Sequence, residues 1–550
     1  MPKIRSSFFL LYFLFCFFAA VAQPLQQKQA FTHADTLRGT ITPERAWWDV
    51  THYDVQVGFD FNKRSIAGYN IISYTIVSEP AKEMQIDLQV GLAIDSIRYR
   101  NESLSFRRNG NAYFVAVPAP ADKEAIQQIT VYYHGIPRPA LHPPWDGGVI
   151  WSKDNNGNPW ISVACQGLGA SVWYPCKDHQ SDEPDSASLS MTVPDTLTAI
   201  ANGRLSNQVN NRDGTTTYTW AVTSAINNYN IIPYIGKYVH WHEDYAGEKG
   251  QLDCDFWVLD YNLEKARTQF KQVMPMLRCF EHWFGPYPFY ADGYKLIEAP
   301  HLGMEHQSAV AYGNGFANGY KGTDLSGSGW GLKWDFIIVH ESGHEWFGNN
   351  ITTKDVADMW IHEGFTNYAE TIFTGCLYGT EAGNDYVIGT RKKIRNDKPI
   401  EGPYGVNQEG SGDMYYKGGN LVHMIRQIIN NDSSFRMLLR GMNQTFYHQT
   451  VTGKQIEEYI SKSSGIDFSK VFDQYVRTTQ IPALEYKISA NKLSYRWANC
   501  VKGFNMPLKI YFGGEKWIQP TGKWKTLKIK KGETAGFSAD RNFYINMEQL

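Results

Sequence analysis

The sequence predicts a multidomain α+β protein, with β-structure at both ends of the chain and a mostly helical region between them. The chain has 550 residues, more than one hydrophobic core usually supports. Apolar and polar residues alternate from about residue 53 to 237 and again after Pro482, which is typical of half-buried strands. From about residue 261 to 480 apolar residues recur at helical spacing instead. We therefore expect a β-domain at 23–258, a helical domain at 259–480 and a small β-domain at 481–550.

The first 22 residues have the features of a cleavable secretory signal. Lys3 and Arg5 give a short basic start, residues 8–21 are apolar, and Ala20-Val21-Ala22 forms a small-residue end. We therefore expect an exported protein, either periplasmic or secreted. The apolar stretch of 14 residues is short for a bilayer span. An uncleaved membrane anchor is the less favoured alternative, and we expect no stable membrane insertion after cleavage.

Turn and helix-stop residues divide the rest of the chain into elements. The N-terminal alternation falls into runs separated by Gly, Pro and Asn. The first helix of the central region is expected from about Tyr261, and Phe284-Gly285-Pro286 ends it. Seven glycines between Tyr312 and Leu332 predict a loop, either a flexible lid or a disordered insertion. The N-terminal runs are Val55, Val57 and Phe59, then Ile72, Tyr74 and Ile76, then Met84, Ile86 and Leu88.

Composition and charge argue against nucleic acid as a partner. Hydrophobic residues make up 43% and aromatic residues 14% of the chain, as expected for a well-packed globular protein. With a net charge of −2, the chain shows no excess of the basic residues that a nucleic-acid-binding protein uses to contact phosphates. The basic segment Arg391–Arg395 is interpreted as a solvated helix face.

Six cysteines remain once residues 1–22 are removed, an even number that an oxidising compartment would allow to pair. Their wide spacing fixes no connectivity, and free buried thiols are an equal alternative to disulfides. These residues are Cys165, Cys176, Cys254, Cys279, Cys376 and Cys500.

The most informative motif is His340-Glu341-Ser342-Gly343-His344, followed after eighteen residues by Glu363. Two histidines four positions apart stand on one face of a helix, so both imidazoles can bind one ion. With Glu363 as the third ligand, a zinc ion keeps a fourth position for water, as catalytic zinc does and structural zinc does not. We therefore predict one zinc ion per chain, bound by His340, His344 and Glu363 in a hydrolytic site beside Glu341.

Several alternatives stay open around this motif. The histidines could share a helix face without a metal, and cobalt or manganese could replace zinc in vitro. His362 neighbours Glu363 but points about 100° away on the same helix, so it is interpreted as a supporting or surface histidine. Glu370 lies seven residues after Glu363 on the same helix face and could hydrogen-bond a ligand histidine.

With these ligands placed, the chain resembles the gluzincin zinc aminopeptidases of the aminopeptidase N and leukotriene A4 hydrolase family. His340–Asn349 is similar to the family's zinc helix and Trp360–Phe365 to its third-ligand helix. Gly303-Met304-Glu305-His306-Gln307 is similar to the G-x-M-E-N exopeptidase motif. It departs from that motif because Leu302 stands in place of the first glycine and His306 in place of the asparagine.

Two further segments extend the resemblance and imply roles for their residues. Ala164–Leu168 resembles the strand whose Gln or Glu helps to hold the substrate amine, here Gln166 beside Glu305. Gly303 and Met304 complete that substrate-binding segment. Tyr415-Tyr416-Lys417-Gly418 resembles the Y-x-K-G segment of the catalytic tyrosine, which makes Tyr415 the candidate and Tyr416 the alternative. Glu341 is then the general base, and the tyrosine stabilises the oxyanion.

The resemblance also implies an architecture. It consists of an N-terminal saddle-like β-domain, a thermolysin-like catalytic domain and a small C-terminal β-sandwich. The sequence ends at Leu550, about 70 residues after the catalytic region. The long helical C-terminal domain of larger relatives is therefore expected to be missing, which would leave the cleft more open.

The predicted function is that of a metallo-aminopeptidase that hydrolyses N-terminal residues from peptides with a free N-terminus. An epoxide hydrolase of the leukotriene A4 type is one alternative, because that branch also has a glutamine at the position of Gln166. A zinc endopeptidase is a second, and it would gain support if Glu305 were dispensable. A non-catalytic peptide-binding module is disfavoured by Glu341 and Tyr415. The preferred first residue and the oligomeric state are not predicted.

Overall fold

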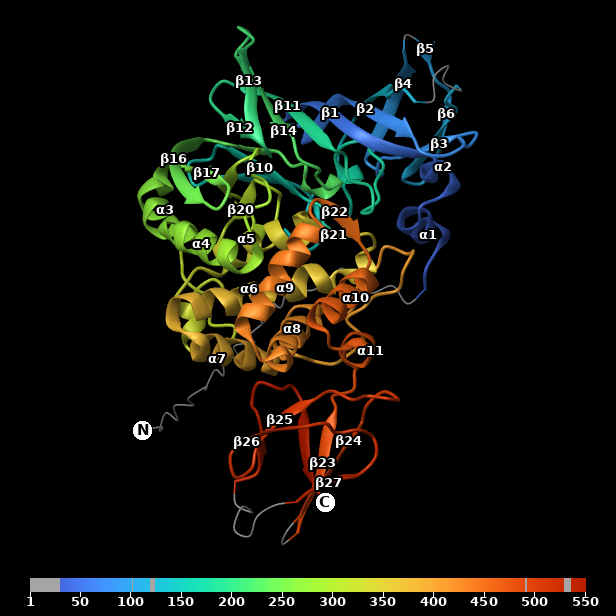
Figure 1. Cartoon of the computed structure of the whole chain (residues 1–550). Coiled ribbons are helices and arrows are strands. Elements are labelled where there is room, and N and C mark those ends of the chain that lie inside the picture. The colour runs from blue at the N-terminus through green and yellow to red at the C-terminus, as the bar shows by residue number, and fades with distance from the viewer. Residues whose placement is uncertain (1–29, 101, 119–123, 490–491, 529–535) are drawn as a thin grey trace, which may run out of the picture.

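The computed structural model describes residues 30–100, 102–118, 124–489, 492–528 and 536–550. The predicted signal sequence lies outside these residues. Figure 1 shows β-sheets at the top, helices in the middle and two small sheets at the bottom, in chain order. The predicted multidomain α+β fold is confirmed. In the described part of the chain, no helix combines the length and the apolarity needed to cross a bilayer.

An eight-stranded sheet forms most of the N-terminal region, in the order β13-β14-β11-β1-β2-β8-β4-β5. Tyr53, Val55 and Val57 of β1 are buried at alternate positions, as the period-two pattern predicts. Its strands are β1 (Trp48–Asp60), β2 (Ser65–Ile76), β4 (Leu92–Tyr99), β5 (Glu102–Ser103), β8 (Gln127–Gly135), β11 (Ser186–Pro194), β13 (Arg204–Asn210) and β14 (Thr215–Val222).

Two smaller sheets and two short helices complete this region. The sheet of order β12-β15-β10-β9 positions a predicted substrate-binding residue, because β10 ends two residues before Gln166. The elements are β9 (Gly148–Lys153), β10 (Pro159–Ala164), β12 (Thr198–Ile200) and β15 (Tyr234–Gly236), the sheet β3 (Met84–Asp87), β6 (Phe106–Asn109) and β7 (Ala112–Val115), and helices α1 (His33–Gly39) and α2 (Pro43–Ala46).

A five-stranded mixed sheet of order β16-β17-β18-β20-β19 borders the helices. β17 pairs in parallel with β18, so the predicted boundary between residues 258 and 259 lies within one sheet. The edge strand β19 is Gly303–Met304 and places the following Glu305 beside the helices. The other strands are β16 (Tyr238–Gly247), β17 (Gly250–Leu259), β18 (Tyr294–Glu298) and β20 (Val310–Tyr312).

The central region is mostly helical, and its longest helix, α6, packs against α4, α5, α7 and α8. Apolar side chains on all these helices build one core, which the helical spacing predicts. The helices are α3 (Leu263–Gln269), α4 (Val273–Phe284), α5 (Phe336–Gly343), α6 (Trp360–Tyr378), α7 (Thr380–Thr390), α8 (Tyr416–Ile429), α9 (Asp432–Thr445), α10 (Gly453–Ser464) and α11 (Ser469–Arg477), with the strand pair β21 (Ile351–Thr353) and β22 (Gln449–Val451).

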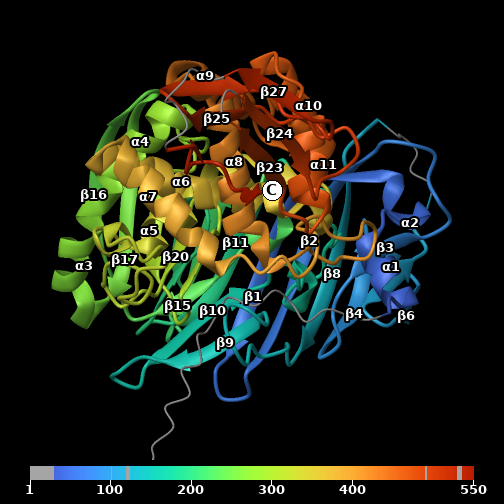
Figure 2. The same ribbon diagram turned by 90° about the horizontal axis from the view of Figure 1, so that it is seen from below.

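The C-terminal region consists of two small sheets of orders β27-β24-β23-β29 and β26-β25-β28. Phe537 contacts Tyr486 of the first sheet and Phe512 beside the second, so the sheets share an apolar interior. These strands lie beneath α8 and α11 in Figure 1 and in front of them in Figure 2. They are β23 (Ala483–Ser489), β24 (Lys492–Ala498), β25 (Leu508–Tyr511), β26 (Glu515–Ile518), β27 (Lys525–Lys528), β28 (Ser538–Ala539) and β29 (Asn546–Gln549).

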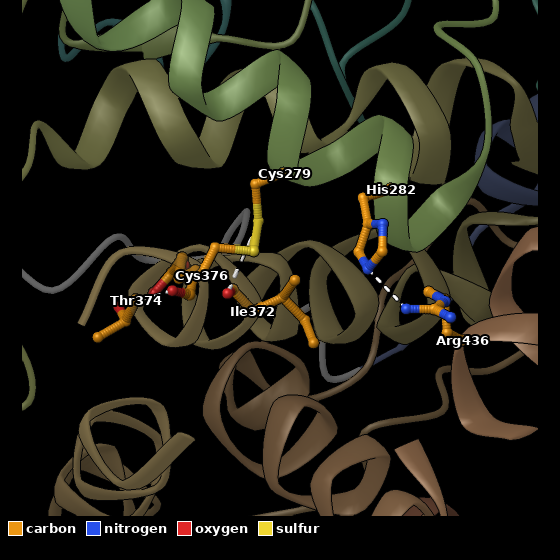
Figure 3. The surroundings of a disulfide bond; sticks show 7 residues. Cys279, His282, Ile372, Thr374, Cys376 and Arg436 are labelled. Atoms are coloured by element: carbon orange, nitrogen blue, oxygen red, sulfur yellow. Dashed lines mark hydrogen bonds between the residues drawn. A yellow bond between two sulfur atoms is a disulfide. The ribbon is translucent and has the colours of Figure 1, made fainter. Parts of the chain in front are cut away.

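A disulfide between Cys279 and Cys376 joins α4 to the end of α6 (Figure 3). The two cysteines are 97 residues apart in the sequence, so spacing alone could not pair them. Cys165, Cys176 and Cys254 are free and buried, and Cys500 is free and half-buried.

Replacing both Cys279 and Cys376 by serine is expected to lower the free energy of unfolding by about 2–4 kcal/mol, because the cross-link restricts the unfolded chain over a long loop. Thermal unfolding of the oxidised protein measures this, and reductant should bring the unsubstituted protein close to the variant. Cys500→Ser is the control and should change stability by less than about 1 kcal/mol. Equal stability of the double variant and the unsubstituted protein would contradict the prediction.

Candidate active site

The predicted metal ligands converge between helices α5 and α6. Asp335 caps α5 by accepting hydrogen bonds from the amides of Ile337 and Ile338. His340 lies on α5, His344 is its C-terminal cap, and Glu363 lies in the first turn of α6. The Oε2 atom of Glu363 is 3.5 Å from Nε2 of His340 and 3.4 Å from Nε2 of His344. All three side chains are buried.

These three residues fit a zinc ion. Two ligand atoms, each about 2.1 Å from a tetrahedral ion, lie about 3.4 Å apart, which matches the observed separations. Buried Oε2 of Glu363 makes no hydrogen bond in the described part of the chain, so a cation would satisfy an otherwise orphaned acceptor. Nitrogen and carboxylate donors are also the ligand types that zinc prefers.

A second set of contacts orients the histidines. Nδ1 of His340 lies 2.8 Å from Oε1 of Glu370, and Nδ1 of His344 lies 2.9 Å from the carbonyl oxygen of Phe347. These acceptors place the ring protons on Nδ1 and leave both Nε2 atoms for a metal. Glu370 is itself held by hydrogen bonds from Tyr386 and Asn367, which places it where the helix spacing predicts.

Glu370→Gln is therefore expected to weaken zinc binding by about 10- to 100-fold, because the amide loses the charge that strengthens the contact with His340. Competition with a chromophoric chelator measures this affinity. Glu264→Gln, at an exposed position of α3, is the matched control and should leave the affinity unchanged. Unchanged zinc affinity in Glu370→Gln would show that the contact does not support the ligand.

Glu341 lies next to the ligand set, within the cluster of possible ligand atoms that it forms with His340 and His344. Burial raises the pKa of its carboxyl to about 7, while the two histidines oppose the rise. A bound cation would oppose it further, because positive charge favours the carboxylate. Gly303 faces this side chain so closely that a Cβ there would lie 2.8 Å from Oε1 of Glu341.

A second carboxylate, Glu305, lies beside the ligands. Its Oε1 accepts hydrogen bonds from Nε2 of Gln166 at 2.5 Å and from the hydroxyl of Tyr229 at 3.1 Å. Burial raises the pKa of Glu305, and positive charge on His344 opposes the rise. Gln166 and Glu305 are 139 residues apart in sequence, so the fold joins two motifs that only the family resemblance connected. No motif or residue spacing in the sequence predicted that Tyr229 contacts Glu305.

The loop that carries Gln166 is held from two sides. Arg38 of α1 donates to the carbonyl of Leu168 at 2.5 Å and to Asp178 at 2.9 Å. Asn407 donates to the carbonyl of Gly167 at 2.8 Å. Neither Arg38 nor Asn407 belongs to a motif, so sequence reasoning missed both.

Tyr415 follows the 3₁₀ turn Gly412–Met414, and its ring stacks on His340 with a centroid separation of 6.0 Å. Burial raises the pKa of its phenol well above the usual value, so the hydroxyl stays protonated and can donate a hydrogen bond. Tyr416 lines the same cleft, so the alternative is close in space as well as in sequence.

All nine predicted site residues line one cleft of about 420 Å³. Leu302, which departs from the motif, lies in the same wall, whereas His306 is buried and its Nδ1 faces the hydroxyl of Tyr234. The nine are Gln166, Gly303, Met304, Glu305, His340, Glu341, His344, Glu363 and Tyr415.

Three sequence interpretations need adjustment. His362 is buried, and its Nε2 accepts a hydrogen bond from the amide of Thr353, so it is not a surface residue. The glycine-rich loop is neither disordered nor detached, since Asn314 binds its backbone and Tyr320 and Leu325 line the cleft. The segment Arg391–Arg395 is not simply a solvated helix face, because α7 ends at Thr390, Arg391–Lys393 forms a 3₁₀ turn, and Lys393 and Arg395 line the cleft.

Comparison with known proteins agrees with this arrangement. Residues 270–475 match the peptidase family M1 domain. The chain therefore carries a peptidase family M1 domain at these residues. The predicted resemblance is thereby confirmed, and zinc is the cofactor that this family implies.

Two sequence relatives extend the match beyond the M1 domain. Probable aminopeptidase 2 of Sulfurisphaera tokodaii is 20% identical over 85% of this chain, and leukotriene A-4 hydrolase of Xenopus laevis is 22% identical over 76%. The matched parts cover 59% and 68% of those proteins. The chain therefore corresponds to only part of the longer relatives.

A solved structure of an M1 zinc metallopeptidase from Deinococcus radiodurans has the same fold. It matches with a TM-score of 0.65 at 20% identity, covering 80% of this chain and 96% of that one.

Proposed function

We propose that this M1 protein is a zinc aminopeptidase that removes N-terminal residues from peptides with a free α-amine. One observation carries the proposal. Glu305, with Gln166 and Tyr229 on its oxygen, lies in the same cleft as a three-ligand zinc site. A carboxylate beside the metal ligands pairs with a substrate ammonium and leaves only the first peptide bond within reach of the reacting groups.

Each residue of the site has its own proposed role in peptide hydrolysis. His340, His344 and Glu363 would hold the zinc ion, which when bound acidifies water and polarises the scissile carbonyl. Glu341 takes a proton from the attacking water and delivers it to the leaving nitrogen. The protonated hydroxyl of Tyr415 donates a hydrogen bond to the oxyanion. Gly303 and Met304 form the strand edge along which the peptide lies, and Glu305 with Gln166 fixes its ammonium.

We also propose that the protein is exported, to the periplasm or the medium. The disulfide between Cys279 and Cys376 supports this, because such cross-links persist mainly in oxidising compartments. Detection of the disulfide in protein isolated from its native compartment, by thiol labelling with and without reductant, tests the proposal. A fully reduced protein in the cytoplasm would contradict it.

The activity itself is tested with a panel of aminoacyl arylamides, each with a free and an N-acetylated amine. We expect cleavage of the unblocked substrates only, and loss of that cleavage after zinc chelation. Cleavage of the acetylated substrates would indicate an endopeptidase instead. No cleavage of either, with turnover of a fatty-acid epoxide, would favour the epoxide hydrolase alternative that the leukotriene A-4 hydrolase relative represents.

A further inference from the structure

The loop that carries Gln166 lies between the catalytic cleft and a second cavity of about 830 Å³. Gln166 lines the cleft, Leu168 lines the second cavity, and Gly167 between them lines both. All three residues are half-buried. Because cavities border the loop, close packing cannot fix it as it fixes a core segment, and its position depends on hydrogen bonds instead.

The backbone turns sharply at Gln166. The amide of Leu168 donates to the carbonyl of Gln166 at 2.8 Å, and the amide of Gly169 donates to the carbonyl of Cys165 at 2.7 Å. Gly167 and Gly169 have φ angles of 70° and 103°, in the left-handed region that favours glycine. The turn presents the carbonyls of Gly167 and Leu168 to side chains from other elements.

Three side chains donate to these two carbonyls. Nη1 of Arg38 donates to Leu168 at 2.5 Å, and its Nη2 lies 3.5 Å from the oxygen of Gly167. Nδ2 of Asn407 donates to Gly167 at 2.8 Å, and Nε2 of Gln89 donates to Leu168 at 2.9 Å. Arg38 reaches both carbonyls and is charged, so its hydrogen bonds are expected to be the strongest of this set.

Arg38 is itself held firmly. Its Nη1 also contacts the carboxylate of Asp178 at 2.9 Å. Fully buried Arg45 donates to the backbone carbonyls of Arg38 and Thr40 at 3.0 Å each, and pairs with Asp87 at 2.5 Å. Side chain and backbone of Arg38 are therefore both fixed relative to the N-terminal sheets.

The contacts around Arg38 and Asn407 leave no room for another side chain. A Cβ at Gly169 would lie 2.2 Å from Nη1 of Arg38. A Cβ at Gly39, the last residue of α1, would lie 2.4 Å from the amide nitrogen of Asn407. Helix α1, the Gln166 loop and the segment at Asn407 thus meet at close contact, which places both donors against the loop.

Gln166 connects this support to the amine-binding carboxylate. Its Nε2 donates to Oε1 of Glu305 at 2.5 Å, so its own Oε1 is the atom left to accept a hydrogen bond from a substrate ammonium. A shift of the loop would move this oxygen, and a misplacement of about 1 Å is enough to impair a substrate contact.

We propose that Arg38, assisted by Asn407, is a positioning residue for recognition of the substrate amine. By holding the carbonyls of Gly167 and Leu168, it fixes Gln166 where its side-chain oxygen faces the ammonium beside Glu305. The helix that begins at His33, soon after the predicted signal sequence, thereby takes part in selecting a free N-terminus. This inference rests on the proposed aminopeptidase activity and deepens it.

Arg38→Gln is expected to raise KM for the best unblocked arylamide about tenfold, and Asn407→Gly about fivefold, with kcat changed less than about twofold. The ammonium contact is equally strong in the ground state and the transition state, so its loss appears in KM. Asn407 has a φ angle of 51°, so glycine removes its side chain without backbone strain. Asn407→Gly also keeps the ion pair of Arg38 with Asp178, so it tests the inference even if Arg38→Gln does not fold.

Two matched controls should keep the KM of the unsubstituted protein. Arg138→Gln removes an arginine that lines the same second cavity but donates to the carbonyl of Asp146, at 3.1 Å. Asn499→Gly removes an asparagine with a φ angle of 50° that donates to the carbonyl of Ile481 at 2.8 Å, in the C-terminal region. Zinc content and thermal unfolding are measured for every variant.

A double-mutant cycle separates positioning from general destabilisation. If Arg38 acts through Gln166, adding Arg38→Gln to Gln166→Ala should not raise KM further. If the two increases in KM multiply instead, Arg38 acts independently of Gln166 and the inference is wrong.

Binding without turnover provides the last measurement. Zinc-loaded Glu341→Gln protein is titrated calorimetrically with leucine amide and with N-acetyl-leucine amide. Adding Arg38→Gln should raise Kd for leucine amide about tenfold and leave the acetylated ligand unaffected. Equal affinity for the two ligands before that addition, or an unchanged Kd after it, would overturn the inference. Absence of arylamide cleavage by the unsubstituted protein would instead contradict the proposed function, and the titration would still decide the role of Arg38.

Discussion

Glu341→Gln is expected to lower kcat for peptide hydrolysis by about 10³- to 10⁴-fold while the zinc content stays the same. The carboxylate is proposed to move the proton from water to the leaving nitrogen, and an amide of the same size cannot do so. Because Glu341 is not one of the proposed metal ligands, its loss should leave the three-ligand site intact. Steady-state kinetics on an unblocked arylamide, together with metal analysis of the same sample, measures both quantities.

Glu345→Gln is a matched control one helical turn further along the chain. Burial raises the pKa of Glu345 to about 8, so its carboxyl is largely protonated at neutral pH and resembles an amide. Its oxygens accept from the amide of Ser308 and from Tyr287, away from the predicted roles in catalysis. We expect its kcat to remain within about threefold of the unsubstituted protein. More than a tenth of normal activity in Glu341→Gln would exclude that residue as the general base.

Tyr415→Phe is expected to lower kcat by about 10²- to 10³-fold with little change in KM. The substitution removes only a hydroxyl and keeps the ring that stacks on His340. Burial keeps that hydroxyl protonated, so its proposed contribution is a hydrogen bond to charge that develops only in the transition state. Single-turnover measurements at saturating substrate separate this effect from substrate binding.

Tyr416→Phe provides the comparison, because Tyr416 lines the same cleft and is the sequence alternative. Its kcat should stay within about threefold of normal. If instead Tyr416→Phe were the severely impaired variant and Tyr415→Phe were not, the oxyanion donor would be reassigned to Tyr416.

Local periodicity predicted the architecture well, since it reports directly on which side chains face a core. The alternation of Tyr53, Val55 and Val57 became the buried face of β1. The predicted boundary between residues 258 and 259 shows the limit of such patterns, because β17 ends there and pairs with β18 across it. Strand pairing between distant segments leaves no periodic signal in either one.

The residues of the candidate site also fall into two groups, those that were predicted from the sequence and those that only the structure revealed. His340 and His344 were predictable from spacing, because one turn of helix brings them together whatever surrounds it. Glu363 lies on a second helix and was predicted from its spacing after the motif, whereas only the family resemblance placed Glu305 and Gln166 in advance. Tyr229, Arg38 and Asn407 had neither spacing nor motif, so their contacts with the amine-binding residues became visible only in the fold.

The sequence by itself determined the fold class and the metal-binding chemistry, because residue type and short-range spacing specify donor atoms and helix faces; the candidate roles of Glu341 and Tyr415 came with the family resemblance. Only the tertiary structure decided which cysteines pair, and that Lys393 and Arg395 line the cleft. Helix α7 ends at Thr390 and a 3₁₀ turn follows it, so the exposure of the next residues depends on what packs against them. Long-range packing decides which charged side chains line the cleft, and short-range sequence patterns do not report on that packing.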